Sequence, residues 1–240
     1  RNEESGAALA AHVFDEPGVY NVRMTVSDQS GQSAQASRAI TVLDPNEVYA
    51  GGKTICLSVR NHARHRHCPD GAVVQDGIDA WPKIESNKRY LLRTGQDFTR
   101  LGALTLGQVS NTVIATYGTG NKPLVDEINI QSDSANLSGD WTENVKVIGL
   151  RSRTISQWIT GRNVLIYKNT LRTSGSGILV ARNYEQYRRS GTYEGVLTMP
   201  RNIYVVDNVG YRPEGEYYAE GKTIWMGNEI QRSGFSEGRS

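Results

Sequence analysis

Aromatic and basic side chains recur along residues 144–234 at intervals that a repeating fold would bring together. The aromatic residues are Tyr167, Tyr204 and Trp225, and sugar rings stack on such faces because a sugar has an apolar side and a polar rim. The basic residues that recur are Arg153, Arg172, Arg212 and Arg232. A column of like charges is unstable unless carboxylates or an anionic ligand neutralise it. These residue types favour recognition of a carbohydrate, and of an acidic one if the arginines face it.

The aromatic residues and the arginines can also be explained by contacts with other parts of the protein. The insertion at residues 183–200, or a neighbouring domain, can cover the aromatic rings, and the sequence leaves these alternatives open. For the arginines we expect protein carboxylates as partners, with a uronate chain as the alternative. The acids close enough in sequence are Glu214, Glu216, Glu220 and Glu229. The candidate substrate-binding residues are Tyr167, Tyr204, Trp225 and Arg212.

A repeat of about 20 residues positions these side chains. Similar segments start at Asn144, Asn163, Asn202 and Lys222, at intervals of 19, 39 and 20 residues. The long interval corresponds to two coils, or to one coil with an insertion. Each segment holds a short β-branched strand that ends in Asn or Gly, as the coils of a stacked solenoid do. Such coils bury their apolar sides against their neighbours.

Alternation along these strands predicts which side chains face inward. The expected inward residues are Val145, Val147, Val164, Ile166, Ile203 and Val205. One outward column then contains Lys146, Leu165 and Tyr204, and the next contains Ile148, Tyr167 and Val206. Trp225 lies in or beside these columns, on a strand that slips by one residue. Asn169, Asn208 and Asn228 are expected to form an internal ladder that satisfies buried turn groups.

Charge and hydropathy exclude two classes of protein. The net charge is +2, from 27 basic and 25 acidic residues, whereas a nucleic-acid binder usually has a basic excess. No run of about 18 apolar residues occurs, so no membrane span is expected.

The only two cysteines, Cys56 and Cys68, bracket a segment of 13 residues. We predict a disulfide between them, which implies an oxidising compartment; the alternative is two unrelated free thiols. His62, His65 and His67 lie between these cysteines. Imidazoles at such spacing can bind Zn or Cu, but the interleaved arginines repel a cation. We therefore predict a solvated basic loop and no metal site.

The first 44 residues have a separate β pattern. Residues 19–26 alternate, with Tyr20, Val22, Met24 and Val26 on one face, and turns are expected at Pro17-Gly18 and from Asp28 to Gly31. The motif is His12-x-Phe14-x-x-Pro17-Gly18-x-Tyr20-x-Val22-x-x-Thr25-Val26-x-Asp28-x-x-Gly31, closing on Ile40-Thr41-Val42. It resembles the second half of a PKD domain, an immunoglobulin-like β-sandwich of secreted bacterial proteins. The resemblance implies that residues 1–44 are the C-terminal part of such a sandwich, followed by a linker at Asp44-Pro45-Asn46.

A second resemblance covers roughly residues 53–234, within a domain expected at residues 45–240. Strands are expected at 54–58, 89–93, 103–106, 112–116 and 123–130, and Ile78, Trp81 and Ile84 are expected to plug the first coil as a short helix or an irregular segment. Two motifs carry this resemblance: a strand followed by Arg93-Thr-Gly95, and the later turn Ile114-x-x-Tyr117-Gly118-x-Gly120-x-x-Pro123. They resemble the opening coils of secreted right-handed parallel β-helix proteins of the pectate-lyase-like superfamily. The expected fold class is therefore all-β: a right-handed parallel β-helix after a partial sandwich.

This second resemblance implies chemistry at an outer groove. In lyases of this fold a basic residue removes the proton next to a uronate carboxylate, and a cation or an Arg stabilises the enolate-like charge. The candidate catalytic residues are Lys146, Lys168 and Arg172. No cofactor is predicted, with Ca²⁺ as the cation if the protein is a lyase. A hydrolase would use paired carboxylates, and Asp207 is the only acid in the strand region of these coils.

Two functions of different classes follow. The first is a secreted or cell-surface protein that binds an extracellular acidic polysaccharide and cleaves it by β-elimination. The second is a non-catalytic adhesive or structural protein. About five or six coils are visible, fewer than such domains usually have. Either further coils follow Ser240, or an open end of the β-helix self-associates, because exposed strand edges invite pairing.

Overall fold

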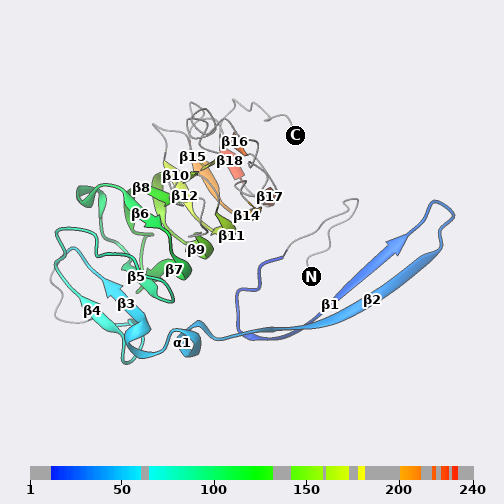
Figure 1. Ribbon diagram of the computed structural model, residues 1–240, viewed down its shortest axis with the longest axis horizontal. Coiled ribbons are helices and arrows are strands. Elements are labelled where there is room, and N and C mark those ends of the chain that lie inside the picture. The colour runs from blue at the N-terminus through cyan, green and yellow to red at the C-terminus, as the bar shows by residue number, and fades with distance from the viewer. Residues whose placement is uncertain are drawn as a thin grey trace. The chain divides into compact units, whose positions relative to one another are not determined.

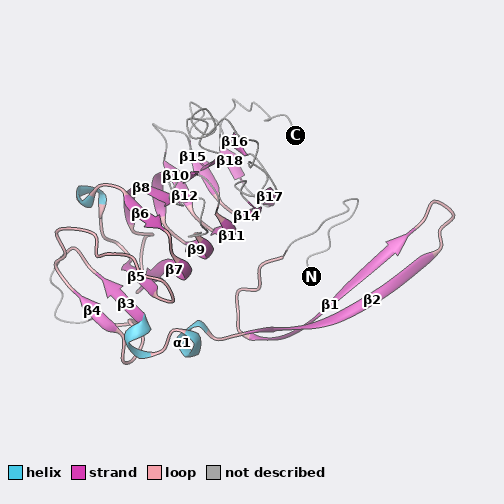
Figure 2. Cartoon of the chain, in the orientation of Figure 1, coloured by secondary structure: helices cyan, strands magenta, loops and turns pink. Residues whose placement is uncertain are grey.

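The computed structural model describes residues 12–60, 65–131, 142–158, 161–172, 178–181, 201–211, 218–219, 223–226 and 229–231. The chain divides into two compact units, Arg1–Ala50 and Gly51–Ser240. Strands dominate the described residues, and their helices are one-turn segments: α1 (Pro45–Val48), η1 (Gly51–Lys53) and η2 (Thr99–Leu101) (Figure 2). The all-β prediction is confirmed.

The first unit contains an antiparallel hairpin of β1 (Gly18–Ser27) and β2 (Ser33–Val42), in which Tyr20 pairs with Ile40 and Val26 with Ala34 (Figure 1). The expected turn follows β1, where Asp28 Oδ1 accepts hydrogen bonds from the Ser30 and Gln32 amides, both at 2.9 Å. The apolar face of β1 is uncovered, since 60% of Met24 and 56% of Val26 is exposed.

Residues 44–46, the predicted linker, form the start of α1. Asp44 Oδ1 caps the helix by accepting a hydrogen bond from the Asn46 amide at 2.7 Å, and Pro45 occupies the first turn. An Asp cap followed by Pro is a helix-start signal, so this turn could have been predicted from the sequence.

The strands described in the second unit form two parallel sheets. The first sheet has the order β17-β14-β11-β9-β7-β5-β3-β4. Its strands are β3 (Thr54–Leu57), β4 (Val73–Gln75), β5 (Arg89–Arg93), β7 (Ser110–Tyr117), β9 (Glu143–Ile148), β11 (Arg162–Tyr167), β14 (Arg201–Val206) and β17 (Thr223–Met226).

The second sheet contains the path β16-β13-β10-β12-β15-β18, with β8 paired to β10 and β6 paired to β8. Its strands are β6 (Leu104–Gly107), β8 (Leu124–Gln131), β10 (Arg151–Trp158), β12 (Thr170–Arg172), β13 (Ile178–Ala181), β15 (Val209–Tyr211), β16 (Tyr218–Ala219) and β18 (Glu229–Gln231). From β5 to β12 successive strands alternate between the sheets, whereas β13 follows β12 and β16 follows β15 within the second sheet. Residues about one repeat apart therefore become neighbours.

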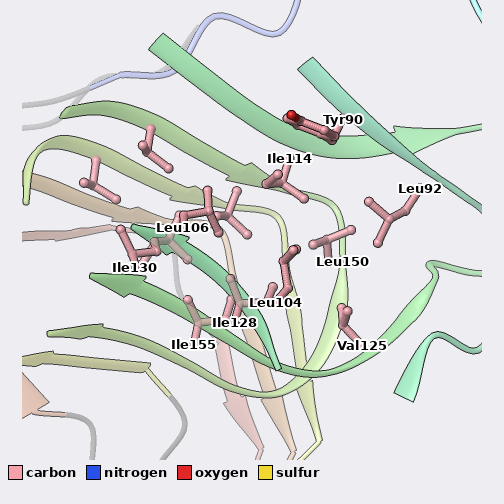
Figure 3. Close-up of a cluster of buried hydrophobic side chains, with 14 of the residues drawn as sticks. Tyr90, Leu92, Leu104, Leu106, Ile114, Val125, Ile128, Ile130, Leu150 and Ile155 are labelled. Atoms are coloured by element: carbon pink, nitrogen blue, oxygen red, sulfur yellow. The ribbon is translucent and has the colours of Figure 1, made fainter. Parts of the chain in front are cut away.

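The core lies between the two sheets (Figure 3). Tyr90, Ile114 and Val147 of the first sheet belong to one buried cluster with Leu104, Ile128 and Ile155 of the second. The six predicted inward residues of β9, β11 and β14 are all buried, and Val164 pairs in register with Ile203, as does Ile166 with Val205. The predicted inward residues and the parallel register are confirmed, but Tyr167 and Val206, which are predicted to face outward, are also buried.

The segment expected to plug the first coil is irregular rather than a short helix. Ile78, Trp81 and Ile84 are partly buried and pack against the core cluster, and no helix is present at these residues. Trp81 stacks on Phe98 at a centroid distance of 5.7 Å and donates its indole hydrogen to the Gly102 carbonyl at 3.0 Å. Pro82 is consistent with the lack of a helix.

The predicted internal asparagine ladder is present at Asn169 and Asn208, while Asn228 lies outside the described residues. Asn169 Oδ1 accepts from the Leu150 amide at 3.0 Å, and its Nδ2 donates to Val147 O and Asn208 Oδ1, both at 3.0 Å. Asn208 Nδ2 donates to Ile166 O at 2.9 Å. Both side chains are buried, so the ladder satisfies turn groups that water does not reach.

A second, outer ladder marks where strands of the first sheet begin. Its members all have a positive φ, between 51° and 59°: Asn87, Asn111, Asn144, Asn163 and Asn202. Their amides form chains, from Asn144 to Asn111 to Asn87 and from Asn202 to Asn163, at 2.9–3.0 Å. Asparagine tolerates this left-handed conformation better than most residues. Three of these residues are the starts that define the sequence repeat.

Candidate functional site

The first outward column runs along the outer face of the first sheet. Lys146 pairs in register with Leu165, Leu165 with Tyr204, and Tyr204 with Ile224. Lys146 is exposed, and Leu165 and Tyr204 are partly exposed. The structure therefore brings the predicted base Lys146 and the predicted stacking residue Tyr204 onto one face, two strands apart.

The second column contains Ile148, Tyr167 and Val206, in register as predicted. Only 5% of Tyr167 is exposed, which favours the alternative of a covered ring for this residue. Trp225 pairs with Val205 rather than with Tyr204 or Val206, so its backbone lies in register with the inward series. Its side chain lies outside the described residues. The three aromatics thus occupy three different columns.

Lys168 stands at the turn that leads from β11 to β12. It is exposed, its φ is +51°, and its Nζ lies 4.8 Å from the centroid of the Tyr167 ring. A cation over an aromatic face at this distance is attracted by the electron density of the ring. The predicted catalytic Lys168 and the predicted binding residue Tyr167 are therefore in direct contact.

A lysine that the sequence did not single out reaches the same turn. Lys122 Nζ donates a hydrogen bond to the Lys168 carbonyl oxygen at 2.5 Å and another to Thr170 Oγ1 at 3.1 Å. Burial lowers the pKa of Lys122, and the positive charge of Lys168 lowers it further. The repeat spacing could not reveal Lys122, because it lies 46 residues before Lys168. We call Lys122, Tyr167, Lys168 and Thr170 the lysine corner.

A third cation borders the lysine corner. Arg151 on β10 pairs in register with Thr170 on one side and with Leu124 on the other. Its charge lowers the pKa of Asp97, although hydrogen bonds from Thr99 contribute more to that lowering. The backbone of Asp97 forms an isolated parallel β-bridge with Leu124.

Asp207 follows β14 at the position that Lys168 takes after β11, and Asp207 is exposed.

The arginine series is partly described. Arg153 contacts Asp126 Oδ1 at 3.3 Å and Glu127 Oε2 at 3.9 Å, both on the neighbouring strand β8. Its partners are thus protein carboxylates, as expected, but not the four glutamates named from the sequence. Arg172 pairs with Tyr211 in the backbone ladder, and its side chain lies outside the described part. Arg212, Arg232, Glu214, Glu216 and Glu220 also lie outside it.

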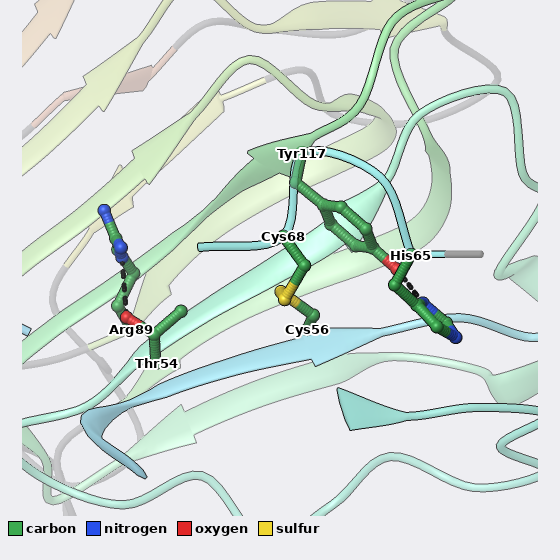
Figure 4. The surroundings of a disulfide bond; sticks show 6 residues. All are labelled: Thr54, Cys56, His65, Cys68, Arg89 and Tyr117. Atoms are coloured by element: carbon green, nitrogen blue, oxygen red, sulfur yellow. Dashed lines mark hydrogen bonds between the residues drawn. A yellow bond between two sulfur atoms is a disulfide. The ribbon is translucent and has the colours of Figure 1, made fainter. Parts of the chain in front are cut away.

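The predicted disulfide joins Cys56 of β3 to Cys68 and closes the segment that we call the disulfide loop, residues 56–68 (Figure 4). Cys56 is buried with Leu91 and Tyr117 on the outer face of the first sheet, and Cys68 packs against them. A disulfide is typical of an oxidising compartment.

His65 fastens the disulfide loop across the first sheet. Its Nδ1 lies 3.1 Å from Tyr117 Oη at the end of β7, and its Nε2 lies 3.3 Å from Asp76 Oδ2, just after β4. Burial raises the pKa of Tyr117, against the lowering effect of a hydrogen bond from Arg93. His62 lies outside the described ranges, and within them no three His, Cys, Asp or Glu side chains converge as metal ligands would.

No helix in the described part of the chain has the length and apolar character needed to cross a membrane. No family model, curated protein or solved structure matches the chain. Its function must therefore be inferred from its own residues.

Proposed function

We propose that residues 45–240 form a right-handed parallel β-helix and that residues 1–44 are the C-terminal part of a PKD-like sandwich. Two parallel sheets that the chain visits in turn support the first assignment. Connections between parallel strands are right-handed in about 98% of cases. The hairpin of β1 and β2, with one apolar face uncovered, supports the second, because a sandwich buries that face against another sheet.

We further propose that the protein is secreted or held at the cell surface, and that it binds an extracellular acidic polysaccharide and cleaves it by β-elimination. The observation that carries this proposal is the lysine corner: two lysines meet beside an aromatic ring, at the edge of an outer face that also carries Lys146. Paired cations attract a polymer with a carboxylate on each sugar.

The roles follow from position. Lys168 is exposed at the turn after β11, and Tyr204 offers a partly exposed ring on the outer face of the first sheet. Arg172, the third predicted catalytic residue, lies on β12, which begins at Thr170 of the lysine corner. Ca²⁺ is the other cation that such a lyase would use, but no cluster of acidic ligands is found within the described ranges, and no step is routed through it.

Binding is tested by isothermal titration calorimetry, in which alginate, pectate and a glycosaminoglycan are each titrated into the protein at two salt concentrations. We expect binding of at least one polymer that weakens with salt. Lys168→Met should weaken it about tenfold, as loss of about 1.4 kcal/mol implies. Lys53→Met on η1 is the matched control and should change little. Lys53 lies just before β3, and β3 is four strands away from β11 in the first sheet. At about 4.8 Å per strand, the two strands are about 19 Å apart.

Cleavage is tested by incubation with the same polymers and measurement of ultraviolet absorbance from the unsaturated product. A rise in absorbance is expected for the polymer that binds. If a broad panel of acidic polymers neither binds nor gives product, the proposal is wrong.

An adhesive or structural role is the second candidate, and exposed apolar residues favour it. On the hairpin, Val22, Met24, Val26 and Ile40 are exposed, and at the edge strand β4 so are Val73 and Val74. Uncovered apolar faces and open edges promote association. Sedimentation velocity over a hundredfold concentration range would show a concentration-dependent increase in size, and a single monomeric species throughout would exclude self-association.

A further inference from the structure

We propose that the acidic polysaccharide lies along the corner where strands of the first sheet end, in contact with four cations that we call the basic track: Arg60, Arg100, Lys122 and Arg151. These cations follow β3, β5, β7 and β9, which are neighbouring strands of the first sheet. The basic track deepens the proposed function, on which it rests, by naming the surface that holds the polymer.

The corner is continuous because its backbone segments stack in register. Asp97 forms a parallel bridge with Leu124, Leu124 pairs with Arg151, and Arg151 pairs with Thr170. Neighbouring strands are about 4.8 Å apart, so this row of four residues extends over about 14 Å. Residues that pair in register point to the same side of a sheet. The row therefore forms one strip of surface that crosses several coils.

Two arginines meet at the beginning of this row. Arg100 donates from Nη2 to the carbonyl oxygens of Val59 and Ile78, at 3.2 and 2.9 Å. Arg60 follows Val59 directly and is exposed, as is Arg100. The charge of Arg60 contributes to the lowered pKa of Asp97, which places Arg60 beside the row.

Two further cations continue the track. Arg151 belongs to the row itself and is partly exposed, and its charge also contributes to the lowered pKa of Asp97. At the far end, Lys122 Nζ donates a hydrogen bond to Thr170 Oγ1 at 3.1 Å. Positive charge is thus present at both ends of the row and within it.

The protein does not neutralise these charges. Within the described ranges none of the four cations forms an ion pair, whereas Arg153, two residues beyond Arg151, contacts Asp126 and Glu127. Arg151 Nε is buried and has no hydrogen-bond partner in the described part of the chain, although most buried polar groups have one. Like charges in a row are unfavourable unless an anion lies between them. The anion that completes this row must come from a ligand.

Asp97 favours a sugar polymer over a polyphosphate. Its Oδ1 accepts the hydrogen bonds from the Thr99 amide and hydroxyl, at 2.9 and 2.6 Å, and among the described residues Oδ2 accepts none. Asp97 is exposed. A carboxylate accepts hydrogen bonds from sugar hydroxyl groups but repels a phosphate. A polymer of uronates offers hydroxyl groups to Asp97 and carboxylates to the cations around it.

The basic track is tested by calorimetric titration of the full chain with alginate, pectate and a glycosaminoglycan. Arg60→Gln and Arg151→Gln should each weaken binding about tenfold, the usual effect of losing a charge-assisted hydrogen bond. Arg151→Lys keeps the charge and should recover part of that loss. Circular dichroism checks that each variant is folded. Affinities of both Gln variants equal to that of the unaltered protein would overturn the track and leave the proposed function intact.

Two control variants remove one charge elsewhere. Lys53 precedes β3, at the edge where strands of the first sheet begin, so Lys53→Met should change the affinity little. Lys146 is exposed on the outer face of the first sheet, with Val113 and Leu165 as its neighbours in register. Lys146→Met should weaken binding less than Arg151→Gln. The opposite order would place the polymer on the outer face and overturn the track.

Chain length provides a second test. From β3, which precedes Arg60, to β11, which precedes Thr170, the first sheet spans four intervals, or about 19 Å. A disaccharide is shorter than this distance, so an octasaccharide of the polymer that binds should have at least about tenfold higher affinity. Equal affinities of the two oligomers would overturn the track.

A single-stranded oligonucleotide with the same number of charges tests the class of polymer. We expect it to bind more weakly than the octasaccharide, because Asp97 lies among the cations. Tighter binding of the oligonucleotide would overturn the assignment to a polysaccharide. If the unaltered protein bound no acidic polysaccharide, the proposed function would fail, and the track would fail with it.

Discussion

Asparagine serves two purposes in this chain, and they place different demands on the residue. In the buried ladder, Asn169 supplies an acceptor for the Leu150 amide and a donor for Asn208. In the outer ladder, Asn163 has a φ of +52°, accepts from Asn202 at 2.9 Å and donates to Glu143 Oε1 at 3.3 Å. The side-chain amide matters most in the first case, and tolerance of the backbone conformation matters most in the second.

Replacement of one asparagine from each ladder separates these purposes. Asn169→Ala leaves the buried Leu150 amide without this acceptor, and we expect a loss of about 2–3 kcal/mol in the free energy of unfolding. Asn163→Gly keeps the left-handed backbone accessible and exchanges hydrogen bonds with water, so its cost should stay below about 1 kcal/mol. Urea denaturation of both variants measures the difference. Equal losses in the free energy of unfolding would contradict the larger stabilisation expected from the buried ladder.

Asp97 allows a test of pH dependence at the residue scale. Hydrogen bonds from the Thr99 hydroxyl and amide, at 2.6 and 2.9 Å, lower the pKa of Asp97, and Arg151 adds to the effect. A lowered pKa in the folded state means that its stabilisation is present above the unfolded value, near 3.8, and is lost as pH falls through the folded value. Asp97→Asn should therefore be less stable than the unaltered protein at pH 7, by a small amount because the carboxylate is exposed to solvent. The gap should close as the pH falls below the folded pKa of Asp97. A gap that is independent of pH would argue against this account.

At the scale of elements, the disulfide loop is attached to the first sheet at two points. The disulfide joins it to β3, and His65 contacts the ends of β4 and β7 through Asp76 and Tyr117. In the sheet these strands are ordered β4-β3-β5-β7, so the loop spans four strands. Its Cys68 packs on the outer face of the first sheet against Cys56, Leu91 and Tyr117, and the outward residues of β9 and β11 continue that face.

Removal of the disulfide should loosen this attachment. A cross-link that closes a loop of this size stabilises by about 3 kcal/mol in the chain-entropy account, so the Cys56→Ala and Cys68→Ala double variant should lose about that amount in thermal or urea unfolding. The matching serine variant should lose more, because Cys56 is buried among Leu91 and Tyr117 and a hydroxyl there is poorly solvated. A double alanine variant as stable as the unaltered protein would contradict the expectation.

At the scale of the whole molecule, the chain consists of two units with separate internal contacts. The second unit has its own core between two sheets, whereas the hairpin of the first exposes most of its side chains. The free energy of folding should therefore reside mainly in residues 51–240, because burial of apolar surface is the main favourable term.

A chain limited to residues 51–240 tests this distribution. We expect it to unfold in the same transition as the full chain, with a midpoint within a few degrees, and to keep the polysaccharide affinity proposed for the lysine corner. Calorimetry and titration measure the two properties. Loss of the folding transition would show that the first unit supports the second.

The sequence by itself determined the strands of the first sheet other than β4, the inward residues and parallel register of β9, β11 and β14, the buried asparagine ladder and the disulfide. These features follow from alternation and from a repeat of about 20 residues, both of which act over short stretches of chain. The tertiary structure alone decided the meeting of Lys122 with Lys168, the contacts of His65 with Asp76 and Tyr117, and the register of Trp225. Such contacts depend on how far a long side chain reaches and on how insertions shift one strand against the next, and no local sequence pattern records either.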